Sequence, residues 1–157
     1  PKGENIEVKC FDFDTQEFLD EIKDNSYDIV LSSSALQWSK DLSKIIKHLS
    51  YITNEINVVL FTSNTFKTIQ ELTKTKSPIL DENSIKEAFS KYFKCEFETI
   101  LYKLEFDNKK DLFDYIKKSG VSGEASLDFK DAKKLYKEYN LNYLEFEVIF
   151  VKTISKL

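Results

Sequence analysis

The stretch YDIVLSSSALQWSKDL, residues 27–42, decides how this chain folds. It begins with an apolar run bounded by polar residues, which is typical of a strand buried on both faces. Ligands of open α/β sheets bind outside the carboxyl ends of the parallel strands. The serines after the run leave room for a ligand there, and Gln37 and Trp38 are placed to wall a pocket. The alternative is a helix N-cap at Ser34 and a tryptophan that packs on the sheet.

Strand-like and helix-like segments alternate on both sides of this stretch. The alternation in the first half predicts parallel strands joined by crossover helices, and two long strands near the end predict an antiparallel edge. We therefore expect an α/β fold with a mostly parallel sheet and helices on both faces. Strands are expected at residues 6–13, 27–33, 55–62, 95–106 and 142–155, and helices at 14–24, 41–52, 64–75, 77–93, 108–120 and 126–139.

Local signals mark the ends and the buried faces of these helices. Asp14 or Thr15 is a candidate N-cap for the first helix, and Asn83 or Ser84 lies near the start of the fourth. Gly120 is a C-cap signal. In the helix at 41–52, apolar residues recur at helical spacing and predict one buried face, made of Leu42, Ile45, Ile46, Leu49 and Ile52.

The composition fits one domain with its own core. The chain has 157 residues, of which 41% are hydrophobic, so residues 1–157 are expected to form a single domain. The formal net charge of −4 gives no support for nucleic-acid binding. All 23 basic residues are lysine, so an anion site built from side chains must use point-like ammonium groups rather than the fork of arginine.

The cysteine, histidine and hydropathy patterns exclude several classes of protein. Cys10 and Cys95 each lie in an apolar strand-like run and are interpreted as buried small hydrophobic residues. No CxxC motif is present and His48 is the only histidine, so no metal site is expected. There is no apolar run of about 18 residues and no signal peptide, so we expect a cytoplasmic protein without a membrane segment.

Several segments, taken in order, carry a resemblance to a known family. They are VKCFDFDTQEF (8–18), DIVLSSSALQWSKDLSKIIKHL (28–49), TFKTIQEL (65–72), DLFDYIKKSGVSG (111–123) and YLEFEVIFVKTISK (143–156). The first two resemble the third- and fourth-strand regions of class I S-adenosylmethionine-dependent methyltransferases. The whole set looks most like the malonyl-thioester O-methyltransferases of biotin synthesis, in which an S-x-x-A-[LV]-Q-W run follows the fourth strand.

The resemblance implies S-adenosyl-L-methionine as the cofactor and the C-terminal part of a Rossmann-like methyltransferase fold. By position, Asp12 is expected to accept a hydrogen bond from the adenine amino group, and Phe13 is expected to contact the adenine. Ser32 and Ser33, at the strand end, are expected to border the cofactor.

The resemblance also implies methyl transfer to the free carboxylate of a malonyl group on acyl carrier protein or coenzyme A. Leu36, Gln37 and Trp38 are expected to line the cleft between cofactor and substrate. Lys117 and Lys118 are expected to meet a phosphopantetheine phosphate or the acidic face of carrier protein, unless they belong to a solvated helix face. No catalytic residue is assigned, because a carboxylate is already a competent nucleophile and catalysis comes mostly from positioning.

The glycine-rich part of the family pattern is missing. The family begins with a strand and an E/D-x-G-x-G-x-G loop, which Gly3, Gly120 and Gly123 cannot supply. The resemblance therefore implies that ~70–100 residues precede the chain, at about 30 or more per strand–helix–strand unit. Such an incomplete domain is expected to be inactive alone and to bind cofactor weakly. An open edge at 27–33 is expected to promote dimerisation, swapping, or rearrangement of segment 1–25.

Two alternatives stay open. A non-catalytic protein with the methyltransferase fold would act as a binding or assembly partner, and translation that begins at Pro1 would favour it. An enzyme of the same class would act on another small carboxylic acid. A longer reading frame that encodes a glycine-rich loop would favour an enzyme over the binding protein.

Overall fold

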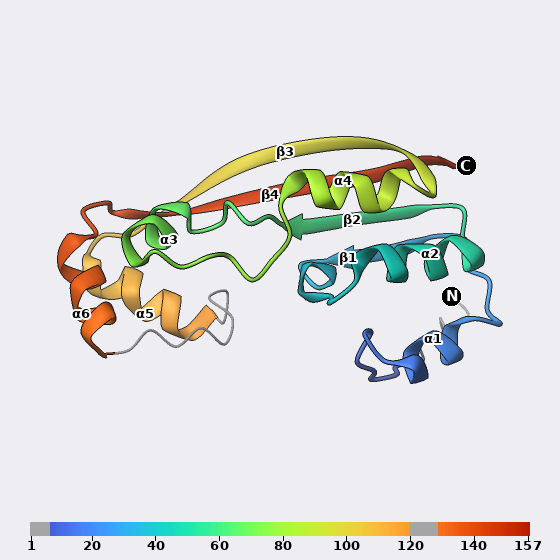
Figure 1. Cartoon of the computed structure of the whole chain (residues 1–157), viewed down its shortest axis with the longest axis horizontal. Coiled ribbons are helices and arrows are strands. Elements are labelled where there is room, and N and C mark those ends of the chain that lie inside the picture. The colour runs from blue at the N-terminus through green and yellow to red at the C-terminus, as the bar shows by residue number, and fades with distance from the viewer. Residues whose placement is uncertain (1–6, 120–128) are drawn as a thin grey trace, which may run out of the picture.

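The computed structural model describes residues 7–119 and 129–157, which form an open four-stranded sheet with flanking helices (Figure 1). The strands lie in the order β1-β2-β4-β3. Along the long axis of the molecule, α1, α2 and α4 lie toward one end and α3, α5 and α6 toward the other. The elements are α1 (Gln16–Ile22), β1 (Val30–Ser33), the 3-10 turn η1 (Leu36–Trp38), α2 (Leu42–Ile52), β2 (Ile56–Phe61), α3 (Lys67–Thr73), α4 (Glu82–Ser90), β3 (Phe93–Glu105), α5 (Lys109–Ser119), α6 (Phe129–Glu138) and β4 (Tyr143–Lys156).

The sheet combines one parallel pairing with two antiparallel pairings. β1 and β2 run parallel, and α2 forms the crossover between them, as in Rossmann-like folds. β4 pairs antiparallel with β2 on one side and with β3 on the other. The α/β class and the antiparallel edge are thus confirmed. The parallel share is smaller than the sequence predicts, because the first expected strand does not join the sheet.

The first expected strand, at residues 6–13, is not a strand in its described part. Residues 7–12 adopt no regular structure, and Val8 is 87% exposed. An extended segment is stable only where a neighbour pairs its N–H and C=O groups, and none of the four described strands pairs with it. The prediction that Cys10 is buried is therefore wrong. Cys95 lies half-buried in β3, where burial raises the pKa of its thiol to about 11.

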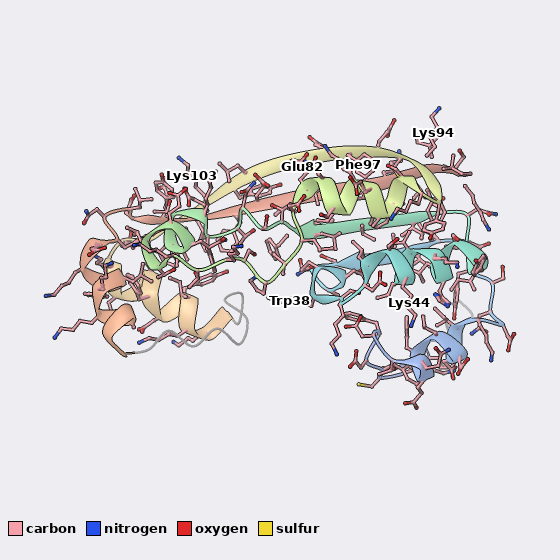
Figure 2. All side chains as sticks on the ribbon, viewed as in Figure 1. Trp38, Lys44, Glu82, Lys94, Phe97 and Lys103 are labelled. Atoms are coloured by element: carbon pink, nitrogen blue, oxygen red, sulfur yellow. The ribbon has the colours of Figure 1, made fainter. Side chains whose placement is uncertain are left out.

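The larger core lies between one face of the sheet and the helices α2 and α4. All five apolar residues predicted for the buried face of α2 are at most 5% exposed, which confirms the helical spacing. They pack with the inward side chains of β2 and β4. α4 contributes Phe89, which is 0% exposed. It also contacts β3, where the Glu82 carboxylate accepts a 3.0 Å hydrogen bond from the Thr99 hydroxyl (Figure 2).

A second apolar cluster covers the other face of the sheet near the beginning of β4. Side chains alternate along a strand, so Leu144 and Phe146 face away from Ile149 and Val151, which belong to the larger core. α5 and α6 pack on this second face, and Leu112 of α5 is completely buried there. The two clusters together confirm that helices lie on both faces of the sheet.

Side-chain caps define the starts of α1, α2 and α4. The Thr15 hydroxyl accepts a hydrogen bond from the first turn of α1, which confirms one of the two candidate caps. α4 begins at Glu82 and is capped by Asp81, so Asn83 and Ser84 lie near its start, as expected. The Asp81 carboxylate accepts from the Ser84 backbone N–H at 3.0 Å and from its hydroxyl at 2.8 Å, and these bonds lower the pKa of Asp81. Its position satisfies free N–H groups of the first turn. Gly120 lies outside the described residues.

β1 is an edge strand with one uncovered face. Val30 and Ser32 are half-buried toward the core, whereas Ile29 is 41% and Leu31 is 69% exposed. Of the helices toward this end, α2 and α4 contribute buried residues, and α1 contributes the partly buried Ile22, to the core on the opposite face. The prediction of a strand buried on both faces is therefore wrong for the described part of the chain.

Candidate functional site

The turn after β1 places the carboxyl ends of the two parallel strands at one edge of the sheet. The Ser34 N–H donates to the Val59 carbonyl oxygen at 2.8 Å, which holds this turn against β2. Ser34 has a φ of 54°, in the left-handed region, which costs a residue with a side chain about 1–2 kcal/mol. Ala35, without a side-chain hydrogen bond, is the N-cap of η1, so the N-cap alternative at Ser34 is wrong. Ligands bind at this edge in open α/β sheets.

The two serines predicted to border the cofactor lie on opposite faces of β1. Ser32 is aligned with Val58 and is half-buried toward the core. Ser33 is aligned with Val59 and is exposed. Of the two side chains, Ser33 is therefore the one that a ligand at this edge can reach directly.

The η1 turn presents its side chains to different environments. Leu36 is 7% exposed and packs into the larger core, so its part in a cleft stays a prediction. Trp38 is 40% exposed, and Figure 2 shows it on the side of η1 away from α2. This exposure argues against a tryptophan that packs fully on the sheet, and it leaves the indole available to cover a ligand.

Gln37 is a buried residue with an unpartnered polar atom. It is 2% exposed, and its side-chain carbonyl oxygen has no hydrogen-bond partner among the described residues. Leaving a buried acceptor unsatisfied costs about 1–3 kcal/mol, and such groups are rare. Because this oxygen is buried away from the surface, a ligand contact to Gln37 stays a prediction.

Asp14 joins the loop before α1 to the end of η1. Its carboxylate accepts a hydrogen bond from the Ser39 hydroxyl at 3.1 Å and another from the Lys40 backbone N–H at 3.1 Å. Residues 12–15 and 36–40 are therefore neighbours in space. Sequence reasoning named Asp14 as a candidate helix cap and did not predict this contact, because nothing local indicates a contact to a serine 25 positions away.

Asp12 and Phe13, the predicted adenine contacts, are thereby brought beside η1. The Asp12 side chain is exposed, and its one hydrogen bond in the described part is from the Asp14 backbone N–H at 2.9 Å. A carboxylate can accept about four hydrogen bonds, so this group retains capacity for a ligand. Phe13 is half-buried against the larger core.

A polar network fixes the loop that follows β2. The Thr62 hydroxyl donates to the Glu147 carboxylate at 2.5 Å, and the Asn64 amide donates to the same oxygen at 2.9 Å. The Gln70 amide donates to the Ser63 carbonyl oxygen at 2.9 Å. Sequence reasoning missed this network, and its signal was an acidic residue inside the apolar closing strand.

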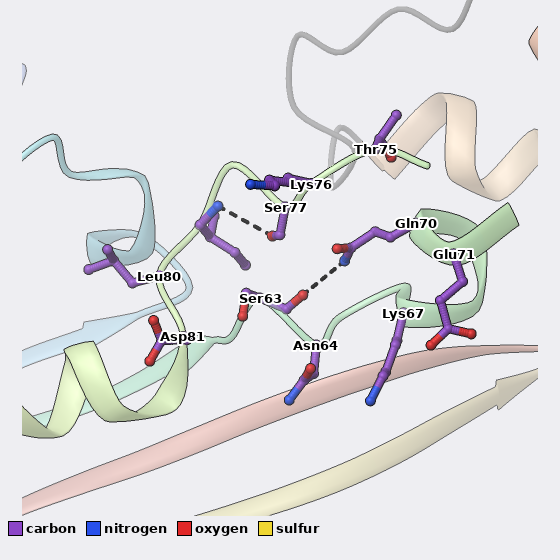
Figure 3. A pocket seen from close by; sticks show the side chains of 11 residues that line it. Ser63, Asn64, Lys67, Gln70, Glu71, Thr75, Lys76, Ser77, Leu80 and Asp81 are labelled. Atoms are coloured by element: carbon purple, nitrogen blue, oxygen red, sulfur yellow. Dashed lines mark hydrogen bonds between the residues drawn. The ribbon is translucent and has the colours of Figure 1, made fainter. Parts of the chain in front are cut away.

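A cavity of about 520 Å³ opens beside this loop (Figure 3). It lies between the end of β2, helix α3 and the segment 75–81 that leads to α4. Its volume is in the range of small-molecule sites. Two lysines from different segments line it, Lys67 of α3 and Lys76 of the segment before α4. The sequence did not predict this cavity, because loop conformation creates it.

Lys117 and Lys118 are not part of this edge. Both are exposed in the last turn of α5, which packs in the second cluster. Figure 1 shows α5 toward the other end of the long axis from α1 and α2. Their position fits a solvated helix end as well as a contact with an acidic partner.

Within residues 7–119 and 129–157, no cluster of histidine, cysteine and acidic side chains is arranged to hold a metal ion. None of the helices described there has the length and apolar character needed to cross a membrane.

No protein-family model matches this sequence, and no curated protein matches it significantly. Solved structures do match its shape. The YcgJ protein from Bacillus subtilis matches with a TM-score of 0.57 and 11% identity, over 85% of this chain and 66% of that chain. The MccD protein matches with a TM-score of 0.45 and 15% identity, over 83% and 62%. Phosphoethanolamine N-methyltransferase 2 from Haemonchus contortus, in complex with S-adenosyl-L-methionine, matches with a TM-score of 0.41 and 13% identity, over 81% and 33%.

The likeness to the YcgJ protein shows that the two chains share a fold. The class defined by the structure is therefore an α/β protein with a Rossmann-like crossover unit and an antiparallel edge. This chain spans about two thirds or less of the length of each matched chain.

Proposed function

We propose that this chain is part of an S-adenosylmethionine-dependent O-methyltransferase that esterifies the free carboxylate of a malonyl thioester in biotin-precursor synthesis. The observation that carries this proposal is the junction made by Asp14, which sets residues 12–15 beside residues 36–40. These two segments are the ones whose sequences resemble the cofactor-side segments of that family. A resemblance in sequence and an adjacency in space thus support the same site.

The residues at this edge fit S-adenosylmethionine in polarity and size. We propose that the exposed Asp12 carboxylate accepts a hydrogen bond from the adenine amino group. The small Ser33 side chain leaves the end of the strand open. When bound, the cofactor supplies an electrophilic methyl group on a positively charged sulfur.

The proposed chemistry is an in-line displacement that needs no proton transfer. One oxygen of the substrate carboxylate attacks the methyl carbon, so that a C–O bond forms while the S–C bond breaks. The electron pair of the broken bond stays on the sulfur, which becomes a neutral thioether. The protein has to align the two groups and exclude water, and we propose that Trp38, which is 40% exposed, helps to exclude water.

We also propose the partners of this protein and its cellular location. The malonyl group is carried by acyl carrier protein or by coenzyme A. Lys117 and Lys118 are exposed in the last turn of α5, and we propose that they contact a phosphopantetheine phosphate or an acidic carrier surface. Both Cys10 and Cys95 are free thiols, which agrees with a cytoplasmic location.

The first prediction is that malonyl thioesters are methylated by the product of the whole reading frame. That protein and this chain are each incubated with S-adenosylmethionine and malonyl-CoA or malonyl-acyl carrier protein, and the methyl ester is detected by mass spectrometry. We expect the ester with the whole product, and weak cofactor binding with little or no ester from this chain. Acetyl-CoA is the matched control, because it lacks the nucleophilic carboxylate.

Two other outcomes of this assay would favour the alternative functions, an enzyme with another carboxylic-acid substrate or a binding protein. Methylation of malonate or another small carboxylic acid, with malonyl thioesters unchanged, would keep the enzyme and replace its substrate. No methyl transfer to any carboxylate, together with no cofactor binding, would contradict the enzyme and favour a binding protein.

One observation favours that second candidate, a binding or assembly protein. The outer edge of β1 has no partner strand in the described part, and Leu31 beside it is 69% exposed. Unpaired edges promote association between chains. We propose that two copies of this chain associate through this edge.

The second prediction is that this chain dimerises through β1. Sedimentation velocity at rising protein concentration is expected to show a monomer–dimer equilibrium, and Leu31→Lys is expected to shift it to monomer. Leu101→Lys is the matched control, because Leu101 is 56% exposed on β3. A monomer at every concentration, or equal effects of the two substitutions, would contradict the proposed interface.

A further inference from the structure

Gln70 presents a fixed hydrogen-bond acceptor to the cavity at the carboxyl end of β2. Its side-chain nitrogen donates to the Ser63 carbonyl oxygen at 2.9 Å and to the Thr65 carbonyl oxygen at 2.7 Å. An amide nitrogen carries two hydrogens, so these bonds use both of them and fix the orientation of the group. The side-chain oxygen of Gln70 is left as an acceptor that no described residue engages.

Ser77 presents a hydroxyl donor to the same cavity. Its Oγ accepts a hydrogen bond from the Ile79 N–H at 3.3 Å, and its own proton has no acceptor in the described part of the chain. Figure 3 shows the Gln70 oxygen and the Ser77 hydroxyl directed toward each other from α3 and from the segment before α4. The N–H and the C=O of a trans secondary amide point in opposite directions. An amide between these two walls is therefore able to donate to one and accept from the other.

The charged side chains that line the cavity balance one another. There are two of each sign, Lys67, Lys76, Glu71 and Asp81. Asp81 stays ionised, because the hydrogen bonds that it accepts from Ser84 lower its pKa. Figure 3 shows the two lysine side chains ending on opposite sides of the cavity. Side chains whose charges sum to zero favour a neutral polar ligand over an anion.

The walls of this cavity are held in place without a ligand. The Ser63 N–H donates to the Leu80 carbonyl oxygen at 2.9 Å, which ties the end of β2 to the segment before α4. The Thr75 N–H donates to the Gln70 backbone carbonyl oxygen at 3.1 Å, which ties the beginning of the same segment to α3. A site with fixed walls loses little entropy on binding, so its hydrogen bonds contribute more fully to affinity.

The cavity shares the sheet edge of the candidate cofactor site. β1 and β2 are adjacent parallel strands, so their carboxyl ends meet at one edge of the sheet. The Ser34 N–H, just beyond β1, binds the Val59 carbonyl oxygen. Ser63, which lines the cavity, follows Phe61, the last residue of β2, by two positions. The cavity therefore opens beside the edge at which methyl transfer is proposed.

We propose that this cavity binds the pantetheine arm of the acyl substrate through the amide nearest the thioester. The N–H of that amide donates to Gln70 Oε1, and its C=O accepts from the Ser77 hydroxyl. This inference rests on the proposed function, because coenzyme A and acyl carrier protein both carry the malonyl group on this arm. Pantetheine has no charge, which suits the balanced cavity, and the half-buried Ile79 offers apolar surface to its dimethyl group. The amide nearest the thioester is assigned here because the malonyl carboxylate has to reach the methyl donor at the end of β1.

Methylation of the ligand tests the Gln70 contact without altering the bonds that hold the loop. The Kd of malonyl-pantetheine for the product of the whole reading frame is measured by isothermal titration calorimetry, which needs no methyl transfer. A methyl group on the nitrogen of the amide nearest the thioester is expected to weaken binding about 10- to 100-fold, because it removes the donor and leaves the Gln70 oxygen unpaired. The same methyl group on the second amide of pantetheine is the matched control and is expected to change the Kd little.

Substitutions at Ser77 test the other half of the site. Ser77→Ala is expected to raise the Kd for malonyl-pantetheine about tenfold, with the Kd for S-adenosylmethionine unchanged. Ser77→Thr keeps a hydroxyl and is expected to retain most of the affinity. Ser90→Ala is the matched control, because Ser90 is an exposed serine at the end of α4 that does not line the cavity. Circular dichroism checks that each variant keeps its fold.

The outcomes separate this inference from the proposed function. Equal weakening by the two methyl groups, or equal Kd values for Ser77→Ala and Ser90→Ala, would overturn the amide site even if methyl esters form. If Ser77→Ala weakened S-adenosylmethionine and left malonyl-pantetheine unchanged, the cavity would belong to the cofactor and the amide site would be overturned as well. Weakening only by the methyl group nearest the thioester, without any methyl transfer, would support the site and remove the enzyme.

Discussion

Replacing Phe89 with alanine is expected to lower the free energy of unfolding by about 3–5 kcal/mol. Phe89 is 0% exposed on α4 and belongs to the cluster that α2, α4, β2 and β4 share. The substitution removes the transfer free energy of the ring and leaves a cavity between elements that cannot fully collapse. The loss is measured by urea denaturation followed by far-UV circular dichroism.

Tyr51→Ala is the matched control for this substitution. Tyr51 is an aromatic residue on α2 that is 66% exposed, so its removal is expected to change the free energy of unfolding by about 0.5 kcal/mol or less. Domains have about 5–15 kcal/mol of stability, so Phe89→Ala could unfold the chain altogether. Phe89→Leu then provides a smaller step whose cost must fall between zero and that of alanine. Equal costs for Phe89→Ala and Tyr51→Ala would contradict the packing of α4 in the core.

The helices were the most predictable part of this fold, because their signals are local. The spacing of apolar residues between 41 and 52 identified both α2 and the face that it buries. Hydrogen bonds within a helix link residues four apart, so a short window of sequence contains nearly all the information needed. The cap of α4, Asp81, was not singled out, since Asp81, Asn83 and Ser84 are all competent N-cap residues.

Strand predictions failed where they depended on neighbours that no local pattern specifies. Residues 7–12 have the composition of a strand but no partner in the sheet, and Leu31 belongs to a real strand whose second face is uncovered. A strand is stabilised by pairing and packing with segments distant in sequence. An apolar run therefore predicts a capacity to form a strand rather than its burial.

The candidate site likewise has a part that the sequence predicted and a part that it did not. The topological rule for open α/β sheets predicts a ligand at the carboxyl ends of parallel strands, and the structure puts Ser33 and the η1 turn at that end of β1. The tie through Asp14 and the cavity beside Lys67 follow from loop conformations and long-range hydrogen bonds. These features have no periodic signal, so only the folded arrangement shows them.

Ser33→Phe is expected to weaken the binding of S-adenosylmethionine by about 10- to 100-fold in the whole protein. Ser33 is exposed at the carboxyl end of β1, where the proposed cofactor passes close to the backbone. A benzyl group there occupies space that the ligand needs, and overpacking of this kind costs about 1–3 kcal/mol, which corresponds to that range of affinity. The Kd is measured by isothermal titration calorimetry, and circular dichroism checks that the fold is retained.

Ser155→Phe is the matched control, because Ser155 is an exposed serine in β4 that lies opposite Lys94 of β3 and away from the carboxyl ends of β1 and β2. It is expected to leave the Kd unchanged. If Ser33→Phe binds the cofactor as tightly as Ser155→Phe does, the cofactor does not pass over the end of β1. The edge defined by Asp12, Gln37 and Ser33 would then lose its proposed role.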